Sequence, residues 1–101
     1  MNNFIVEFSR VQDEVHMNAL EHGFWPPERS DAECIALIHS EASEALEAIR
    51  KGDIDNLLEE LADIVIRVMD FAGNYSLPLS EAILKKHEVN KARPYKHGKK
   101  F

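Results

Sequence analysis

The sequence predicts an all-α fold in which four helices form a bundle within a single domain, residues 1–101. Apolar residues recur with the period of a helix along most of the chain, and no stretch alternates as a strand would. Residues typical of helix starts and helix ends divide this pattern into four segments. The length of 101 residues fits one domain and leaves too little chain for two independent cores.

The first helix is predicted at about 3–21 from its apolar period. It ends before the segment HGFWPPE, in which Gly23, Pro26 and Pro27 interrupt regular structure. The same segment carries Trp25, so an aromatic side chain lies in the connection between two helices.

The second helix is predicted at about 31–51. It follows SDAE, from Ser30 to Glu33, which is a capping-box pattern. In such a box the serine and the acid three residues later satisfy free N–H groups at the helix start. Gly52 comes directly after the helix and favours the left-handed conformation that closes many helices.

The third helix is predicted at about 54–74, with Asp53 as its N-cap. After the turn NYSLP, a fourth helix is predicted at about 79–92, because Pro94 disfavours helical geometry in the residue before it. The segment 93–101, RPYKHGKKF, has no apolar period and is predicted to be a basic, solvent-exposed tail.

The net charge of −6 hides a strong asymmetry along the chain. Residues 1–84 hold 5 basic and 17 acidic residues, whereas residues 85–101 hold 7 basic residues and one acid. An acidic body argues against binding a nucleic-acid duplex, which requires a broad cationic face. No apolar run approaches the roughly 20 residues of a membrane span, and the start MNNFIVEFSR lacks the pattern of a secretion signal. We therefore expect a cytoplasmic protein with no membrane partner.

Two acidic pairs border the apolar stripes of the second and third helices. At ~100° per residue, Glu41 falls within the apolar arc of its helix, and Glu44 falls at the edge, ~60° away. Glu60 and Asp63 repeat this arrangement on the third helix. Acids of a solvated helix normally face away from the apolar stripe, so these four are unusual.

The turn between the two helices predicts that the pairs meet. Glu44 and Glu41 precede Gly52 by 8 and 11 residues, and Glu60 and Asp63 follow Asp53 by 7 and 10 residues. In an antiparallel hairpin the pairs therefore lie level with each other. Four carboxylates at such short distances raise one another's pKa unless a cation neutralises them. An all-oxygen cluster suits Mg²⁺, with Mn²⁺ as a possible substitute.

A simpler interpretation exists for each pair alone. Acids at i, i+3 are common on solvated faces, and Arg67 could pair with Asp63 or Asp70 on its own helix. The coincidence of two pairs, both at an apolar border and both level across a hairpin, favours a metal site.

These acids and their surroundings resemble a known family. The motif E-x-x-E (EASE), 15 intervening residues and E-x-x-D (ELAD) are similar to the signature of the MazG-like superfamily of all-α nucleotide pyrophosphohydrolases. The resemblance runs from about residue 20 to the end, through GFW, SEASEALEAIRKGD, EELADIVIRVMDFA and KHEVNKARPYKHGKKF. The ending K-x-x-x-N-x-x-R-P-Y makes it more specific.

The resemblance implies a Mg²⁺-dependent enzyme that cleaves a nucleoside triphosphate, in particular a deoxy or modified one, to the monophosphate and pyrophosphate. Such an activity cleans the nucleotide pool. The resemblance also implies that the four acids hold the metal and that Lys86, Asn90 and Arg93 contact the phosphates. It further implies a homodimer or homotetramer, because a second subunit completes the site in this family.

Individual roles within this site are predictions of different kinds. Glu41 and Glu44 are the candidate catalytic bases or metal ligands, and Glu41 is preferred because its flanks are the more apolar. Trp25, with His22 beside it, could stack on the base. The equally favoured interpretation is that Phe24 and Trp25 cover the end of the bundle.

Two other classes compete with this function. A di-iron carboxylate bundle would use Glu-x-x-His pairs, and the sequence contains none. A non-catalytic helical interaction or regulatory module with a degenerate metal site is the remaining alternative. The four intact acids argue against it.

Overall fold

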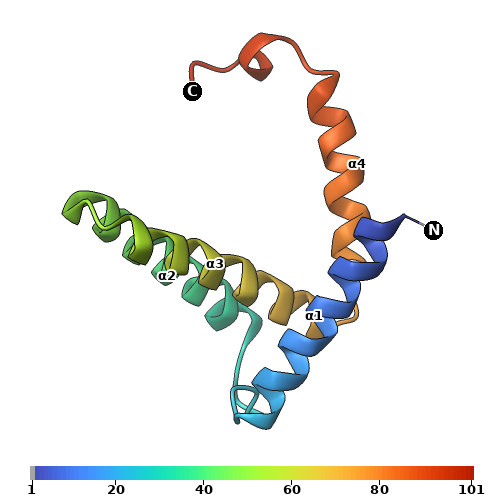
Figure 1. Ribbon diagram of the computed structural model, residues 1–101. Coiled ribbons are helices and arrows are strands. Elements are labelled where there is room, and N and C mark those ends of the chain that lie inside the picture. Colours follow the sequence, from blue (N-terminus) through green and yellow to red (C-terminus); the bar gives the residue numbers. More distant parts are fainter. Residues whose placement is uncertain (1) are drawn as a thin grey trace.

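A computed structural model describes residues 2–101 and shows an all-α chain (Figure 1). Its helices are α1 (Asn3–Glu21), α2 (Asp31–Lys51), α3 (Ile54–Asn74) and α4 (Leu79–Lys91), followed by a short 3-10 helix, η1 (Tyr95–Gly98). Residues 2–101 contain no strand. The all-α prediction is confirmed, and each predicted helix boundary agrees within one residue.

The caps explain why the boundaries could be predicted. The Ser30 hydroxyl accepts a hydrogen bond from the Glu33 backbone N–H at 3.1 Å, as expected for a capping box. Asp53 accepts from the Asn56 N–H at 3.0 Å in the same way. Between these two caps, Gly52 has a φ of 67° and closes α2 in the left-handed conformation.

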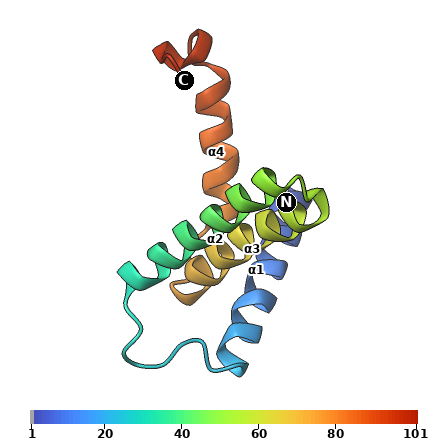
Figure 2. The same ribbon diagram turned by 90° about the vertical axis from the view of Figure 1, so that its left-hand side faces the viewer.

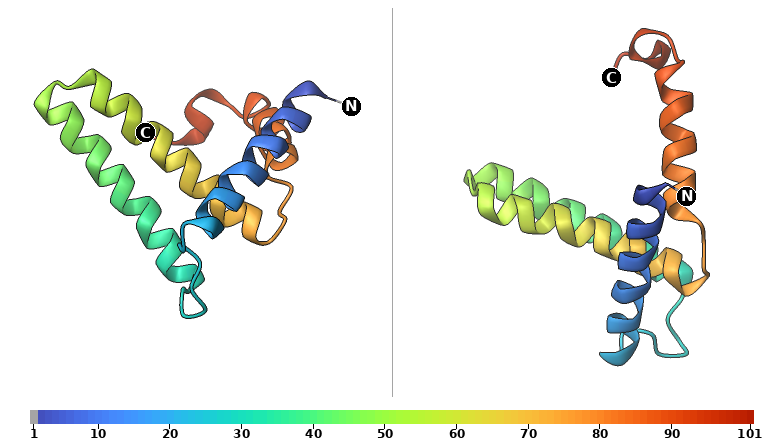
Figure 3. Two further views of the ribbon diagram at one scale, coloured as in Figure 1. Left: turned by 60° about the horizontal axis from the view of Figure 1, so that its bottom comes forward. Right: turned by 45° about the vertical axis from the view of Figure 1, so that its right-hand side comes forward.

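The helices do not form a closed four-helix bundle within one chain. α2 and α3 pack as an antiparallel hairpin, and α1 crosses the C-terminal half of α3 (Figure 1). α4 packs mainly against α1 and projects away from the hairpin (Figures 2 and 3). The prediction of four helices was therefore right, whereas their closure into a bundle is not seen in the isolated chain.

The hydrophobic core of the chain is small. Its buried apolar residues are mostly small: Cys34, Ala45, Ala48, Met69 and Ala72. Many larger apolar residues of the hairpin remain exposed instead: Leu46, Ile49, Ile54, Leu58, Leu61 and Val65. These six residues form what we call the exposed hairpin face. Within residues 2–101, no helix is long and apolar enough to cross a membrane.

Asp70 connects α1, α3 and the loop that follows α1. Its carboxylate is almost fully buried, and Oδ1 accepts the indole N–H of Trp25 at 2.9 Å. The same oxygen lies 2.8 Å from Nδ1 of His16 on α1. Because buried carboxylates are stable only when paired or hydrogen-bonded, this contact fixes both the loop and the crossing of α1.

We predict that Gly73→Ala destabilises the protein at this crossing. A Cβ at position 73 would lie 2.8 Å from the Cβ of His16, so α1 and α3 would have to separate. Overpacking of this kind costs about 1–3 kcal/mol, which exceeds the gain of about 1 kcal/mol from the better helix propensity of alanine. Thermal unfolding should show a lower Tm. Ser43→Ala, at an exposed position of α2, is the control and should leave the Tm unchanged or slightly higher.

Candidate active site

The hairpin brings three of the predicted acids together. Glu41 of α2 and Glu60 and Asp63 of α3 each offer a carboxylate oxygen, and these oxygens lie within 4.8 Å of one another. The turn at Gly52 sets the register that makes the two helices meet in this way. We call these three residues the acidic cluster.

Glu44 lies beside the acidic cluster rather than within it. It is exposed on α2, and its carboxylate is close enough to Glu60 to raise the pKa of that group by charge and by a hydrogen bond. The predicted convergence of the four acids is therefore tight for three of them and looser for Glu44. Their roles as metal ligands stay a prediction.

Glu60 has the most perturbed environment of the four acids. Burial is the largest cause of a pKa raised from 4.5 to about 7, followed by a hydrogen bond with Glu41 and the charge of Glu44. Its Oε2 atom is buried and has no hydrogen-bond partner within residues 2–101. A buried carboxylate oxygen without a donor is costly, and a bound cation would relieve that cost.

The acidic cluster fits a hard divalent ion. All of its donors are carboxylate oxygens, which Mg²⁺ and Mn²⁺ prefer, and no histidine or thiol belongs to it. The Oε2 atom of Glu60 adds a further indication, because it is buried without a hydrogen-bond partner within residues 2–101. The residues present are therefore suited to Mg²⁺.

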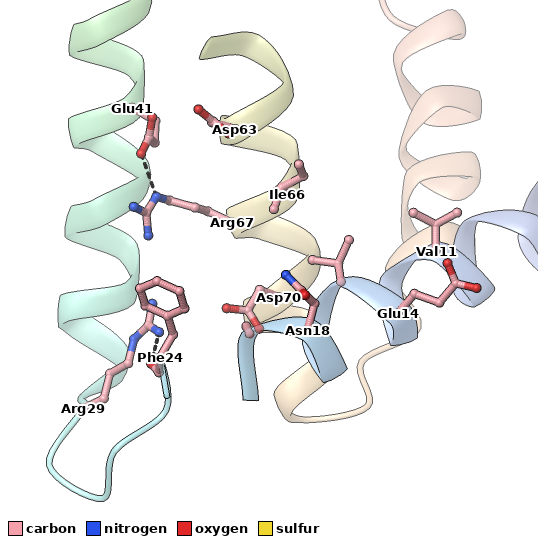
Figure 4. A pocket seen from close by; sticks show the side chains of 12 residues that line it. Val11, Glu14, Asn18, Phe24, Arg29, Glu41, Asp63, Ile66, Arg67 and Asp70 are labelled. Carbon is pink, nitrogen blue, oxygen red and sulfur yellow. Dashed lines mark hydrogen bonds and ion pairs between the residues drawn. The ribbon is translucent and has the colours of Figure 1, made fainter. Parts of the chain in front are cut away.

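Arg67 pairs with the acidic cluster across the hairpin. Its Nε donates to Oε1 of Glu41 at 2.9 Å, and the Glu41 side chain is only 13% exposed. The sequence had suggested Asp63 or Asp70 as its partner, and the structure corrects this. Asp70 already accepts from Trp25 and His16, while Arg67 extends from α3 toward α2 (Figure 4).

A pocket of about 520 Å³ opens next to the acidic cluster (Figure 4). Residues from α1, the following loop, α2 and α3 surround it. Its apolar wall consists of Val11, Val15, Ala19, Phe24 and Ile66. Its polar lining consists of Glu14, Asn18, Arg29, Glu41, Asp63, Arg67 and Asp70. The volume is in the range of pockets that hold small molecules.

The loop after α1 contributes a different aromatic residue from the one that the sequence favoured. Trp25 does not line the pocket, because its N–H is bound to Asp70 and the Arg29 guanidinium lies 4.5 Å from its ring centre. His22 is exposed, and its Nδ1 lies 2.7 Å from the Asn18 carbonyl. Phe24 does line the pocket and is 61% exposed. The sequence had placed Trp25 on the base and had named Phe24 only as part of a cover for the end of the bundle.

The predicted phosphate contacts, two on α4 and one just after it, lie outside this site in a single chain. Neither Lys86, Asn90 nor Arg93 lines the pocket or belongs to the acidic cluster. α4 projects away from the hairpin with Lys86 and Asn90, and Arg93 follows two residues after its end (Figure 3). Asn90 has a buried Oδ1 without a hydrogen-bond partner in residues 2–101, and Arg93 Nη1 lies 3.4 Å from Nδ1 of His97.

Comparison with known proteins identifies a family. The family model of the MazG nucleotide pyrophosphohydrolase domain matches residues 29–92, which is more than half of the chain. This segment contains α2, α3 and α4, and therefore all four predicted metal-binding acids. Neither curated proteins nor solved structures gave a significant match.

The raised pKa of Glu60 predicts a pH dependence of stability in the metal-free protein. Because the folded state holds this proton more tightly than the unfolded state, folding is favoured below the unfolded pKa of 4.5. That contribution is lost as the pH rises from 4.5 through about 7. Denaturant unfolding in EDTA should therefore show that the stability of the parent, relative to Glu60→Gln, falls over this interval. A difference that is constant with pH would contradict the prediction.

Proposed function

Because the chain belongs to the MazG nucleotide pyrophosphohydrolase domain family, we propose that it hydrolyses a nucleoside triphosphate to the monophosphate and pyrophosphate. The proposed substrate is a deoxy or modified nucleotide, the proposed metal is Mg²⁺, and residues 1–101 act as one domain. The observation that carries this proposal is the acidic cluster, with the partnerless Oε2 of Glu60, two of whose members, Glu41 and Asp63, line a pocket of about 520 Å³.

The pocket suits the nucleoside, and the acidic cluster suits the phosphates with their metal. Phe24 and the apolar wall offer a surface on which a base can stack, while the Asn18 amide can hydrogen-bond to the base edge. The opposite end of the same pocket is lined by Glu41 and Asp63. A nucleotide lying along the pocket would thus present its phosphate chain to the acids.

Hydrolysis of a phosphoanhydride requires charge neutralisation and an activated water. A Mg²⁺ ion supplies electrostatic stabilisation of the phosphate oxygens and makes a bound water more acidic. Among the residues of the chain, Glu41 and Glu44 are the proposed proton acceptors. Glu60 and Asp63 complete the proposed ligand set, and neutralisation by the metal would relieve the poor solvation of Glu60.

The proposal includes association of the chain with itself. The exposed hairpin face leaves six large apolar side chains uncovered, and α4 projects from the hairpin without closing the bundle. Packing against a second copy would bury these side chains, as expected for a dimer or tetramer. It would also allow Lys86, Asn90 and Arg93 to approach the acids of another subunit.

A panel of common and modified ribo- and deoxyribonucleoside triphosphates tests the activity. Each is incubated with the protein and Mg²⁺, and the release of monophosphate and of pyrophosphate is measured. Equal molar release of both products from at least one nucleotide is expected. Binding of Mn²⁺ without any turnover would favour the alternative, a non-catalytic helical interaction or regulatory module.

Glu60→Gln is predicted to separate metal binding from folding. Without metal, the variant should be as stable as the parent or more stable, because one of several repelling charges is removed. With Mg²⁺ at about 100 times its Kd, the parent should gain about 2.7 kcal/mol, and the variant should gain less. Turnover should fall by on the order of 100-fold or more, since the charge that places the metal is lost.

The matched control for this variant is Glu59→Gln. It removes the same charge from the neighbouring, exposed position of α3, outside the acidic cluster. Its Mg²⁺-dependent shift in Tm and its turnover should equal those of the parent. If Glu60→Gln and Glu59→Gln behaved alike in both measurements, the acidic cluster would not be the metal site.

Self-association makes a separate prediction. Light scattering at micromolar concentration should give at least twice the chain mass of 11.5 kDa. Leu58→Glu places a charge on the exposed hairpin face and should shift the particle toward the monomer. Glu47→Gln, on the exposed surface of α2, is the control. An active 11.5 kDa particle would contradict the proposed assembly.

A further inference from the structure

Arg67 lies between the acidic cluster and the part of the pocket proposed to hold the nucleoside. It extends from α3 toward α2, with Glu41 and Asp63 on one side of its guanidinium group and Phe24 and Arg29 on the other (Figure 4). Its side chain is 35% exposed and lines the pocket. The guanidinium group therefore contacts the acidic cluster and faces the pocket at the same time.

Most of the hydrogen-bonding capacity of Arg67 is unused. Within residues 2–101, its only hydrogen bond runs from Nε to Oε1 of Glu41, and neither terminal nitrogen has a protein acceptor. Arg29 differs, since it is held against the loop by the Phe24 carbonyl and the Trp25 ring. Of the two arginines in the pocket, Arg67 is the one whose two terminal nitrogens both lack a protein acceptor within residues 2–101, whereas the free donor that is buried on Arg29 is its Nε. The fork of N–H donors on two such nitrogens matches the oxygens of a phosphate group.

We propose that Arg67 is an exchangeable counter-ion of Glu41. In the metal-free protein the guanidinium group neutralises this buried carboxylate. A divalent cation bound to Glu41 replaces it in that role, because both are cations competing for the same carboxylate. Arg67 is then released to bind a phosphate oxygen of the nucleotide.

The charges in the pocket support this exchange. Glu14, Asp63 and Asp70 line the same space, so an incoming polyanion meets negative potential unless cations are present. A guanidinium group cannot lose its proton at physiological pH, so Arg67 must always face an anion or water. Metal binding and phosphate binding by Arg67 therefore reinforce each other, which makes nucleotide binding depend on the metal through a residue that is not a metal ligand.

This inference rests on the proposed function and adds a residue from the same chain to the predicted phosphate contacts. Arg67→Gln tests it by two measurements that should change in opposite directions. Calorimetry with Mg²⁺ alone should show binding about 3-fold or more tighter than in the parent, because a competing cation is gone. At saturating Mg²⁺, inorganic pyrophosphate should bind about 10-fold or more weaker, because the charged fork is lost.

Two further variants make the result specific. Arg67→Lys keeps the charge without the planar fork, so Mg²⁺ affinity should stay near that of the parent while pyrophosphate affinity lies between those of the parent and Arg67→Gln. This variant also serves if Arg67→Gln fails to fold. Arg50→Gln is the matched control, because it removes an arginine paired with an acid, Glu47, on the exposed face of α2. It should change neither affinity.

Several outcomes would overturn the inference. Unchanged pyrophosphate binding in Arg67→Gln would show that the guanidinium group contacts no phosphate, while the proposed function would stand. A loss of both Mg²⁺ and pyrophosphate affinity would show that Arg67 holds Glu41 in place and does not exchange. A parent protein that binds no Mg²⁺ would remove both this inference and the proposed metal dependence.

Discussion

Crowding of carboxylates between α2 and α3 is the constraint on which the rest of this structure depends. The turn at Gly52 sets a register in which Glu60 faces both Glu41 and Glu44, and burial leaves it poorly solvated. Like charges in that position repel one another, so their neutralisation stabilises the packing of α2 against α3. The chain contains two means of doing so, a proton on Glu60 and the guanidinium group of Arg67 on Glu41. The proposed Mg²⁺ is a third and would replace both.

Two acids of α3 differ in how the hydrogen-bonding capacity of their buried oxygens is satisfied. Asp70 is almost fully buried, yet it accepts from Trp25 and contacts His16, so it joins α1 and the loop to α3. Glu60 has an equally inaccessible oxygen and no donor for it. The first arrangement builds the wall of the pocket. The second leaves a buried oxygen without a donor in the acidic cluster, which is typical of a site that binds a cation.

The sequence predicted what depends on local chemistry. Helix boundaries followed from the caps at Ser30, Gly52 and Asp53, and the convergence of the acids followed from counting residues on either side of one turn. The partner of Arg67 could not be predicted, because Asp63 and Asp70 lie within four residues of it on the same helix and Glu41 lies on another helix. Only the packing of α1 against α3 shows that Asp70 is already occupied by His16. That Phe24 lines the pocket while Trp25, which the sequence had placed on the base, does not likewise depends on a loop conformation in which Asp70 binds the Trp25 N–H.

The position of α4 was the least predictable feature of the fold. It determines where the basic residues of segment 85–101 lie relative to the acidic body of the chain. α4 carries a weaker apolar stripe than α3, so nothing in its sequence fixes it against the hairpin of its own chain. The basic residues of segment 85–101 consequently lie apart from an acidic body with 17 acids and 5 bases.

Arg29 and Arg67 are the two cationic residues that line the pocket, and Arg29 already contacts the Phe24 carbonyl and the Trp25 ring, so the proposed triphosphate would meet few free cations there. Under the proposed assembly, the exposed hairpin face of one copy and the α4 of another would meet for two reasons at once, burial of apolar surface and attraction between opposite charges. Folding of the chain and completion of the site would then be two stages of one process. In this proposal the hairpin would form the metal-binding half within a chain, and association would supply the remaining cations.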